Sequence, residues 1–353
     1  MLNIFCYHFG IGGWATHAKN FISSLSKLEE IALIGWEPPV ADEVSPQVLA
    51  MLENGLRLSK NNTGLAIGPM EKMTRIIGRK TIAYTVWETT RIPRQKLSCL
   101  DQVDEIWIPS SWGKQVLIEN GVRANKIRVV PEGVDTEFFK PAQQDRASRS
   151  ASFKFLHVGK WEERKGVKEL IRSFCEEFSP REEVELILHC YSPFFSRSDP
   201  VAEVRKLNTR SHTITVSNAP LSASALSNLY AACDAFVLPT RAEGWGLPII
   251  EAMASALPVI VTDYSGHTDF ANPDNAYLIK VEKLIDVDDP LWFQSQIDYG
   301  QWAQPDLDHL KQLMRYVYEN RDEACEKGLK ARKSVVENWT WAHSAATAHN
   351  YLL

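Results

Sequence analysis

The chain has 353 residues, of which 44% are hydrophobic and 24% are charged. This length exceeds one ordinary core and predicts two domains in a globular protein. The net charge of −5 excludes a global basic field for binding nucleic acid, and no apolar run approaches the roughly 20 residues that span a bilayer.

The amino terminus and the cysteines point to a cytoplasmic protein. Residues 1–6 lack a basic leader and lead directly into a strand-like run, so no signal peptide is expected. The six cysteines are scattered, and no pair has the spacing of metal ligands. We therefore expect buried free thiols in a reducing compartment.

Short apolar runs alternate with segments of helical periodicity in the first part of the chain. Strands are expected at residues 2–7, 31–34, 81–86, 104–108 and 127–130, and helices at 14–28 and 111–120. The strands are apolar at consecutive positions, which is typical of a parallel sheet covered on both faces.

A polar run at residues 143–150 predicts a linker, after which the alternation restarts. Strands are expected at residues 154–158, 184–190, 213–216, 234–238 and 258–262, and helices at 167–174, 226–233, 307–317 and 339–351. We therefore predict an α/β protein with two Rossmann-like domains facing each other across a cleft. The predicted boundaries are residues 1–140, a linker at 141–152, residues 153–335 and a last helix at 336–353.

The first glycine cluster, Gly-Ile-Gly-Gly at residues 10–13, follows the first strand. It lacks the full G-x-G-x-x-G spacing, and no acidic residue ends the second strand, so an NAD site is not expected. Two interpretations stay open. One is a tight strand–helix turn. The other is a loop in which Gly12 and Gly13 bring the backbone close to a phosphate or a sugar.

The second cluster lies at residues 157–166, after the first strand of the second half. Lys160 and Lys165 stand five positions apart, and Gly166 precedes a helix. Two cations at a strand–helix junction can bind a pyrophosphate. Taken alone, solvated surface lysines are the favoured interpretation.

The third cluster follows the strand predicted at residues 234–238. Gly244 and Gly246 permit close approach of a ligand, and Pro248 indicates the first turn of a helix, whose amino terminus attracts anions. Glu243 precedes the helix and Glu251 lies within its first turns. This arrangement suits a phosphorylated ligand that also carries hydroxyl groups.

The segment EGWGLPIIE, from Glu243 to Glu251, resembles the signature of glycosyltransferase family 4, the retaining enzymes of the GT-B fold. Segments that resemble the same family lie at residues 130–139, 156–166, 229–239 and 257–266. The resemblance covers nearly the whole chain, but its specific motifs lie in the second half. It implies that the last helix crosses back to the first domain.

The resemblance implies roles for the charged residues. Glu251 is expected to hold the ribose hydroxyls of a nucleotide, and Glu243 to contact hydroxyls of the donor sugar. Lys160 and Lys165 are expected to neutralise the departing diphosphate. Donor binding through loops is expected from Gly12, Gly13, Gly159, Gly244, Trp245, Gly246 and Leu247. No cofactor and no metal are expected, because no Asp-x-Asp stands where a metal-dependent enzyme places one.

The sequence departs from the family pattern at two positions. Lys160 stands where the family usually has arginine, which keeps the charge but loses the bidentate fork. Trp87-Glu88 stands where many relatives have histidine, and Trp-Glu-Thr followed by Ile-Pro resembles a subgroup of the family. Glu88 is expected to touch the acceptor hydroxyl or the sugar, and a structural glutamate capping a loop is an equal alternative.

Other polar residues carry weaker signals. His157 is expected in the core, whereas His267 and His17 are expected near the cleft. Residues 70–80 interleave cations with apolar side chains. A solvated helix face is the favoured interpretation, and peripheral contact with the inner face of a membrane, as in some relatives, is the alternative.

The sequence therefore predicts a metal-independent, retaining glycosyltransferase acting in polysaccharide biosynthesis. Its expected partners are a nucleotide-diphosphate sugar, based on UDP or GDP, and a glycan, glycolipid or protein acceptor. Nucleic acid is not expected as a partner. Two alternatives stay open: a nucleotide-sugar epimerase or sugar phosphorylase of the same fold, and a non-catalytic nucleotide-sugar-binding subunit of a glycan assembly complex.

Overall fold

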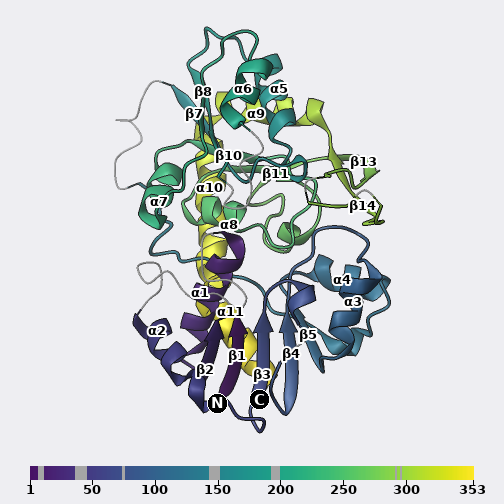
Figure 1. Cartoon of the computed structure of the whole chain (residues 1–353). Coiled ribbons are helices and arrows are strands. Elements are labelled where there is room, and N and C mark those ends of the chain that lie inside the picture. Colours follow the sequence, from purple (N-terminus) through teal and green to yellow (C-terminus); the bar gives the residue numbers. More distant parts are fainter. Residues whose placement is uncertain are drawn as a thin grey trace. The chain divides into compact units, whose positions relative to one another are not determined.

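The structure is a computed structural model that describes residues 1–6, 12–35, 46–73, 76–142, 152–191, 199–290, 292–294 and 296–353. The chain divides into two compact units. Unit 1 comprises Met1–Gly133, Ile297–Gly300 and Trp339–Leu353, and unit 2 comprises Val134–Gln296 and Gln301–Asn338. Each unit is built on a parallel sheet with helices, which confirms the predicted α/β class (Figure 1).

The described part of unit 1 contains a six-stranded parallel sheet in the order β2-β1-β3-β4-β5-β6. Its strands are β1 (Leu2–Cys6), β2 (Ile31–Gly35), β3 (Thr63–Ile67), β4 (Lys80–Tyr84), β5 (Glu105–Ile108) and β6 (Ile127–Val129). Its helices are α1 (Gly13–Leu25), α2 (Pro46–Glu53), α3 (Arg94–Asp101), α4 (Ser111–Glu119) and α11 (Trp341–Leu352), with short 3-10 helices at Asn54–Arg57, Met70–Lys72 and Ala124–Lys126.

Strand β3 was not predicted from the sequence, although it lies between β1 and β4. Gly64 and Ala66 give the run a weak strand propensity. The packing of the chain explains the glycine, because a Cβ on Gly64 would lie 2.6 Å from the carbonyl oxygen of Ile77. Tertiary packing therefore overrides local propensity in this strand.

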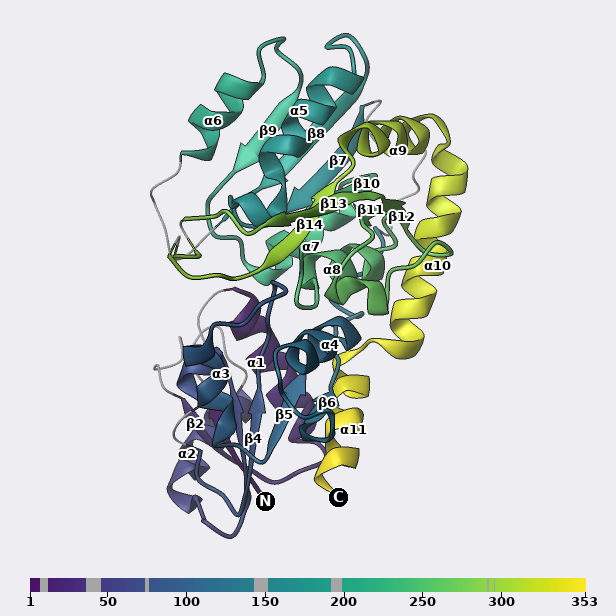
Figure 2. The ribbon, with the colours of Figure 1, turned by 90° about the vertical axis from the view of Figure 1, so that its right-hand side faces the viewer.

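The described part of unit 2 contains a six-stranded parallel sheet in the order β12-β11-β10-β7-β8-β9 and a separate antiparallel hairpin, β13-β14 (Figure 2). The strands are β7 (Phe153–Val158), β8 (Val184–His189), β9 (Ile214–Ser217), β10 (Ala235–Leu238), β11 (Val259–Thr262), β12 (Tyr277–Ile279), β13 (Val281–Asp286) and β14 (Gln301–Pro305). The helices are α5 (Val167–Glu177), α6 (Pro200–Leu207), α7 (Ala223–Ala231), α8 (Leu247–Ala254), α9 (Leu307–Glu319) and α10 (Arg321–Asn338), with 3-10 helices at Glu163–Lys165 and Gly266–Asp269.

Helix α5 shows why the periodic pattern predicted elements well in this unit. Leu170, Ile171 and Phe174 recur at helical spacing and are fully buried against the sheet core around Phe155. Each such side chain contributes roughly 1.5–3 kcal/mol by leaving water. The apolar stripe therefore fixes which face of α5 lies against the strands.

Helix α11 follows α10 in the sequence and belongs to unit 1. Its Trp341 is buried, and the Ser344 hydroxyl donates a hydrogen bond to the carbonyl oxygen of Pro131 at 2.5 Å. Gly133 lies so close that a Cβ on it would be 2.3 Å from the Trp341 nitrogen. The predicted linker, residues 141–152, lies almost entirely outside the described residues.

The stretch at residues 70–80 differs from the helix face that we expected. Among its described residues only Met70–Lys72 is helical, as a short 3-10 turn. Met70 and Met73 are buried in the core of unit 1, so they do not form an exposed apolar face. Within the described residues, no helix has the length and apolar character needed to cross a membrane.

Candidate functional site

Three neighbouring strands of unit 2 carry the charged residues singled out from the sequence. β11, β10 and β7 lie side by side, and the chain order reverses between β10 and β7. Ligands of open α/β sheets bind at such a switch point, outside the carboxyl ends of the strands. Lys160 and Lys165 follow β7, and Glu243 follows β10, so their loops leave the same edge of the sheet.

The structure brings Glu243 and Lys165 into direct contact. The Lys165 Nζ lies 2.6 Å from Glu243 Oε1, and Arg164 Nη1 lies 3.3 Å from Oε2. The Thr240 hydroxyl donates to Glu243 Oε1 at 2.8 Å. Burial alone would raise the pKa of Glu243, but the two cations outweigh it and lower this pKa to about 2. Glu243 is therefore ionised at neutral pH.

Arg164 was not singled out from the sequence, although it directly precedes Lys165-Gly166. Its side chain is buried and lies 2.6 Å from a carboxylate oxygen of Glu162. It also donates to the carbonyl oxygen of Ala242 at 2.7 Å. With Glu162 and Glu243 it completes a balanced cluster in which two cations face two carboxylates. Such pairing reduces the cost of burying these charges.

Gly166 permits the loops after β7 and β10 to pack together. Its φ of +64° is in the left-handed region, and a Cβ on it would lie 2.3 Å from the Pro239 carbonyl oxygen. Beside it, the Arg241 N–H donates to the Arg164 carbonyl oxygen at 2.7 Å. The Lys-Gly pair of the motif therefore supplies both the cation and the close backbone contact.

A third loop, which follows β11, forms hydrogen bonds to the backbone of Glu243. The Glu243 N–H donates to the Ser265 hydroxyl oxygen at 2.8 Å. The Gly266 N–H donates to the Glu243 carbonyl oxygen, and a Cβ on Gly266 would lie only 2.1 Å from the Gly244 carbonyl oxygen. Ser265-Gly266 therefore fixes the backbone of the Glu243-Gly244 turn, a function that sequence analysis did not assign.

Gly246 opens helix α8 with a left-handed φ of +104°, and Pro248 stands in the first turn as predicted. The Trp245 ring is buried, with its centroid 4.8 Å from that of Phe270. The tryptophan thus anchors the turn through its side chain. Any contribution of Trp245 to a ligand is therefore expected from its backbone, as the resemblance implies.

Glu251 lies on α8 and is 7% exposed. The Tyr230 hydroxyl, from α7, donates to its Oε2 at 2.9 Å. Burial raises the pKa of Glu251 to about 8, because this hydrogen bond only partly offsets the loss of solvation. Without a ligand Glu251 is therefore mostly protonated at neutral pH, and it can both donate and accept hydrogen bonds.

Lys160 lies on the same loop as Gly159 but has a different neighbour from Lys165. Its Nζ lies 4.5 Å from the ring centroid of Trp292, within the range of a cation–π interaction. Trp292 lies in the connection between β13 and β14, and no role was predicted for it from the sequence. Because 132 positions separate the two residues, local patterns gave no sign of this contact.

Unit 1 holds the remaining predicted residues. Gly12 precedes α1 with a left-handed φ of +119°, and Gly13 is the first residue of the helix, whereas Gly10 and Ile11 lie outside the described residues. Glu88 follows β4 and is partly exposed. Beside it, the Trp87 ring stacks on Tyr299, with ring centroids 6.3 Å apart.

All three histidines singled out from the sequence are buried. His157 is buried as expected, and burial lowers its pKa to about 3. His267 is also fully buried and hydrogen-bonds the Thr262 carbonyl oxygen at 2.6 Å, and a Cβ on Gly246 would lie 3.2 Å from its Cβ. His17 is 1% exposed, and its Nδ1 lies 2.8 Å from Glu132 Oε1. The burial of His17 and His267 was not predicted from the sequence, because it depends on tertiary packing.

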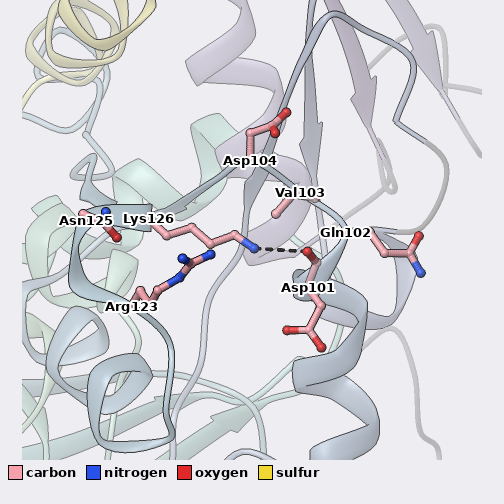
Figure 3. Close-up of a pocket in the computed structure, with 7 residues that line it drawn as sticks. All are labelled: Asp101, Gln102, Val103, Asp104, Arg123, Asn125 and Lys126. Atoms are coloured by element: carbon pink, nitrogen blue, oxygen red, sulfur yellow. Dashed lines mark hydrogen bonds between the residues drawn. The ribbon is translucent and has the colours of Figure 1, made fainter.

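A polar cavity of about 350 Å³ lies in unit 1, at the amino ends of β5 and β6 (Figure 3). Its lining includes Asp101, Arg123 and Lys126, and the Lys126 ammonium donates to the Leu100 carbonyl oxygen at 2.7 Å. This edge is opposite to the carboxyl ends of the strands, where ligands of such sheets bind. The cavity is therefore separate from the predicted site.

Comparisons with known proteins match the part of the chain that holds this cluster of unit 2. Residues 152–289 match the family model described as "Glycosyl transferases group 1". The chain is 26% identical over 216 residues to the D-inositol 3-phosphate glycosyltransferase of Acidothermus cellulolyticus, covering 57% of this chain and 46% of the relative. It is 24% identical over 241 residues to the MMP alpha-(1->4)-mannosyltransferase of Mycolicibacterium hassiacum, covering 68% and 51%. The chain thus spans about half the length of these curated relatives.

Among solved structures, the chain is similar to the Anabaena protein HepE in complex with UDP-glucose. The TM-score is 0.73 at 14% identity, and the match covers 99% of this chain and 98% of HepE. Sucrose-phosphate synthase from Thermosynechococcus elongatus gives a TM-score of 0.71 at 15% identity, covering 99% and 97%. The chain therefore has the GT-B fold, and its residues 152–289 are similar in sequence to group 1 glycosyltransferases.

Proposed function

We propose that the chain is a retaining glycosyltransferase. It moves a sugar from a nucleotide-diphosphate sugar to a hydroxyl group of a sugar, lipid-linked or protein acceptor. The observation that carries this proposal is the buried Lys165–Glu243 pair, with its 2.6 Å contact at the switch point of unit 2. The cluster lies within the segment similar to group 1 glycosyltransferases. UDP-glucose in the HepE complex supports a nucleotide-sugar donor, which we propose to be based on UDP or GDP.

In the proposed reaction the bond between the anomeric carbon and the phosphate oxygen breaks, and the acceptor oxygen attacks from the same face. The departing phosphate oxygen takes the acceptor proton, so no protein nucleophile, metal ion or cofactor takes part. Lys160 and Lys165 stabilise the charge on the diphosphate, and the Trp245, Gly246 and Leu247 backbone lies beside it. Lys165 is already paired with Glu243 before the donor arrives.

The carboxyl groups have separate tasks in this proposal. Glu243 accepts hydrogen bonds from hydroxyls of the donor sugar, because its low pKa keeps it ionised. Glu251 holds the two ribose hydroxyls, and the Tyr230 hydroxyl orients it. Glu88, from unit 1, contacts the acceptor hydroxyl or the sugar. We propose that the reaction takes place in the cytoplasm.

The test combines binding with product analysis. A thermal-shift panel of UDP-, GDP- and ADP-sugars identifies the donor, because a ligand that binds only the native state raises the melting temperature. The selected donor, with a ¹³C-labelled sugar, is then incubated with mixed glycoside acceptors, and the products are analysed by mass spectrometry. A labelled glycoside supports the proposal. An epimerised donor or a sugar phosphate without a glycoside would overturn it, as would donor binding without transfer or hydrolysis.

The matched variants Lys165→Met and Lys206→Met test whether sugar transfer depends on the site. Lys165 is buried against Glu243, whereas the Lys206 side chain is 71% exposed and pairs with Glu203 on its own helix. Both changes remove one lysine charge from unit 2. The proposal requires loss of transfer in the first variant and normal transfer in the second.

A further inference from the structure

The connection between β13 and β14 approaches the loop that carries Lys160. It spans residues 287–300 and is described apart from residues 291 and 295. Its Trp292 presents a ring whose centroid lies 4.5 Å from Lys160 Nζ. A lysine carries a point charge on a flexible four-carbon stem, so it needs a neighbour to hold it in one place.

Trp292 is itself held by hydrogen bonds to a buried residue. The N–H groups of Trp292 and Phe293 donate to the Asp289 carbonyl oxygen at 3.1 and 2.8 Å. Asp289 is 3% exposed, and its carboxylate accepts a hydrogen bond from the Glu163 N–H at 3.2 Å. The connection is thus attached to the same loop that places Lys160 and Lys165.

The aromatic neighbours strengthen this attachment. The Phe293 ring packs edge-to-face on Trp302, with centroids 5.9 Å apart, and Trp302 is buried in β14. The Ala303 N–H donates to the Arg241 carbonyl oxygen at 2.9 Å. The hairpin and its connection therefore lie against both loops of the Glu243 cluster, while Trp292 stays partly exposed above Lys160.

We propose that Trp292 is a positioning residue that holds the Lys160 ammonium in place for the donor diphosphate. This inference rests on the proposed function and deepens it. The ring face attracts the cation electrostatically while leaving the ammonium N–H groups able to donate to phosphate oxygens. Trp292 acts through Lys160 and takes no part in bond making.

A double-mutant cycle tests the proposal. It compares four proteins: the wild-type chain, Trp292→Leu, Lys160→Met and the double variant. For each protein we measure kcat and KM with the donor as the varied substrate, and the affinities for UDP and GDP. We expect Trp292→Leu to lower kcat/KM about two- to fivefold, the range of a cation–π contact. In the Lys160→Met background, Trp292→Leu should not lower kcat/KM any further. Trp292→Phe, which keeps an aromatic ring, should lower kcat/KM less than Trp292→Leu does.

The same contact has a readout that needs no activity. Reductive ¹³C-methylation keeps the lysine charge, and the Lys160 signal, assigned with Lys160→Arg, should show a ring-current shift that disappears in Trp292→Leu. Equal losses from Trp292→Leu in both backgrounds would overturn the proposal, because Trp292 would then act without Lys160. An unchanged Lys160 signal would also overturn it.

Failure of the proposed function is distinguishable from failure of this inference. If the wild-type chain binds UDP or GDP but transfers no sugar, the proposed function fails. The double-mutant cycle can then still be evaluated from the nucleotide affinities of the four proteins. Coupling between Trp292 and Lys160 in that affinity supports the positioning role, and its absence rejects it. If neither nucleotide binds, both proposals fail.

Discussion

Replacing Glu251 by glutamine is expected to stabilise unit 2 at neutral pH and to weaken nucleotide binding. Glu251 is buried on α8, and burial raises its pKa from the ordinary value of 4.5 to about 8. Glutamine has nearly the same shape, and its amide oxygen can still accept the hydrogen bond from Tyr230. The substitution therefore removes an ionisation that disfavours folding while keeping the packing.

The magnitude follows from the two pKa values. The folded state holds the Glu251 proton more tightly than the unfolded state, so stability is lost as the pH rises from about 4.5 to about 8. This shift costs about 1 kcal/mol at pH 5 and about 4 kcal/mol at pH 7.5. Glu251→Gln should therefore gain about 3 kcal/mol over the wild-type chain between these two pH values.

Urea unfolding at pH 5 and pH 7.5 measures this gain, with Glu326→Gln, an exposed carboxyl on α10, as the control. The control should follow the wild-type curve at both pH values. Calorimetry should show that Glu251→Gln binds UDP and GDP about 10- to 100-fold more weakly, because an amide has one acceptor oxygen where the carboxyl group has two for the ribose hydroxyls. If the free energy of unfolding differs between Glu251→Gln and the wild-type chain by the same amount at pH 5 and pH 7.5, the raised pKa of Glu251 is wrong.

Three further outcomes are expected. Gly133→Ala should destabilise unit 1 by at least about 2 kcal/mol in urea unfolding, because its Cβ would lie 2.3 Å from the Trp341 nitrogen, and an unchanged midpoint would contradict this packing. Lys165→Met should lower turnover about 10²- to 10³-fold in a donor-consumption assay, with Lys206→Met unaffected. Glu243, with its pKa near 2, adds stability that is present above about pH 4.5 and is lost as the pH falls toward 2. The stability of Glu243→Gln should therefore depend less on pH in this range, and an acid-unfolding transition equal to that of the wild-type chain would contradict this prediction.

The sequence was most informative where local pattern and packing coincide. The apolar runs predicted most strands of both sheets, because parallel strands buried on two faces need apolar residues at consecutive positions. β3, the three-residue strand β12 and the β13-β14 hairpin were missed. A glycine weakens the strand signal in β3, and β13 is largely exposed rather than apolar.

The candidate site was predictable in its residue types but not in its pairing. Glycines next to Lys165 and Glu243 indicated a ligand loop, yet their contact joins positions 78 residues apart and depends on how β7 lies beside β10. The same is true of Tyr230 with Glu251. The burial of His17 was not predicted either, because its partner Glu132 lies 115 positions away in the sequence.

The most direct test of the proposed function is the anomeric configuration of the product. The donor identified in the thermal-shift panel, with a ¹³C-labelled sugar, is incubated with the 353-residue chain and an acceptor, and the anomeric coupling constant is measured by NMR. We predict release of the nucleoside diphosphate matched by a glycoside with the same anomeric configuration as the donor. A glycoside of inverted configuration, or a sugar phosphate as the only product, would contradict it.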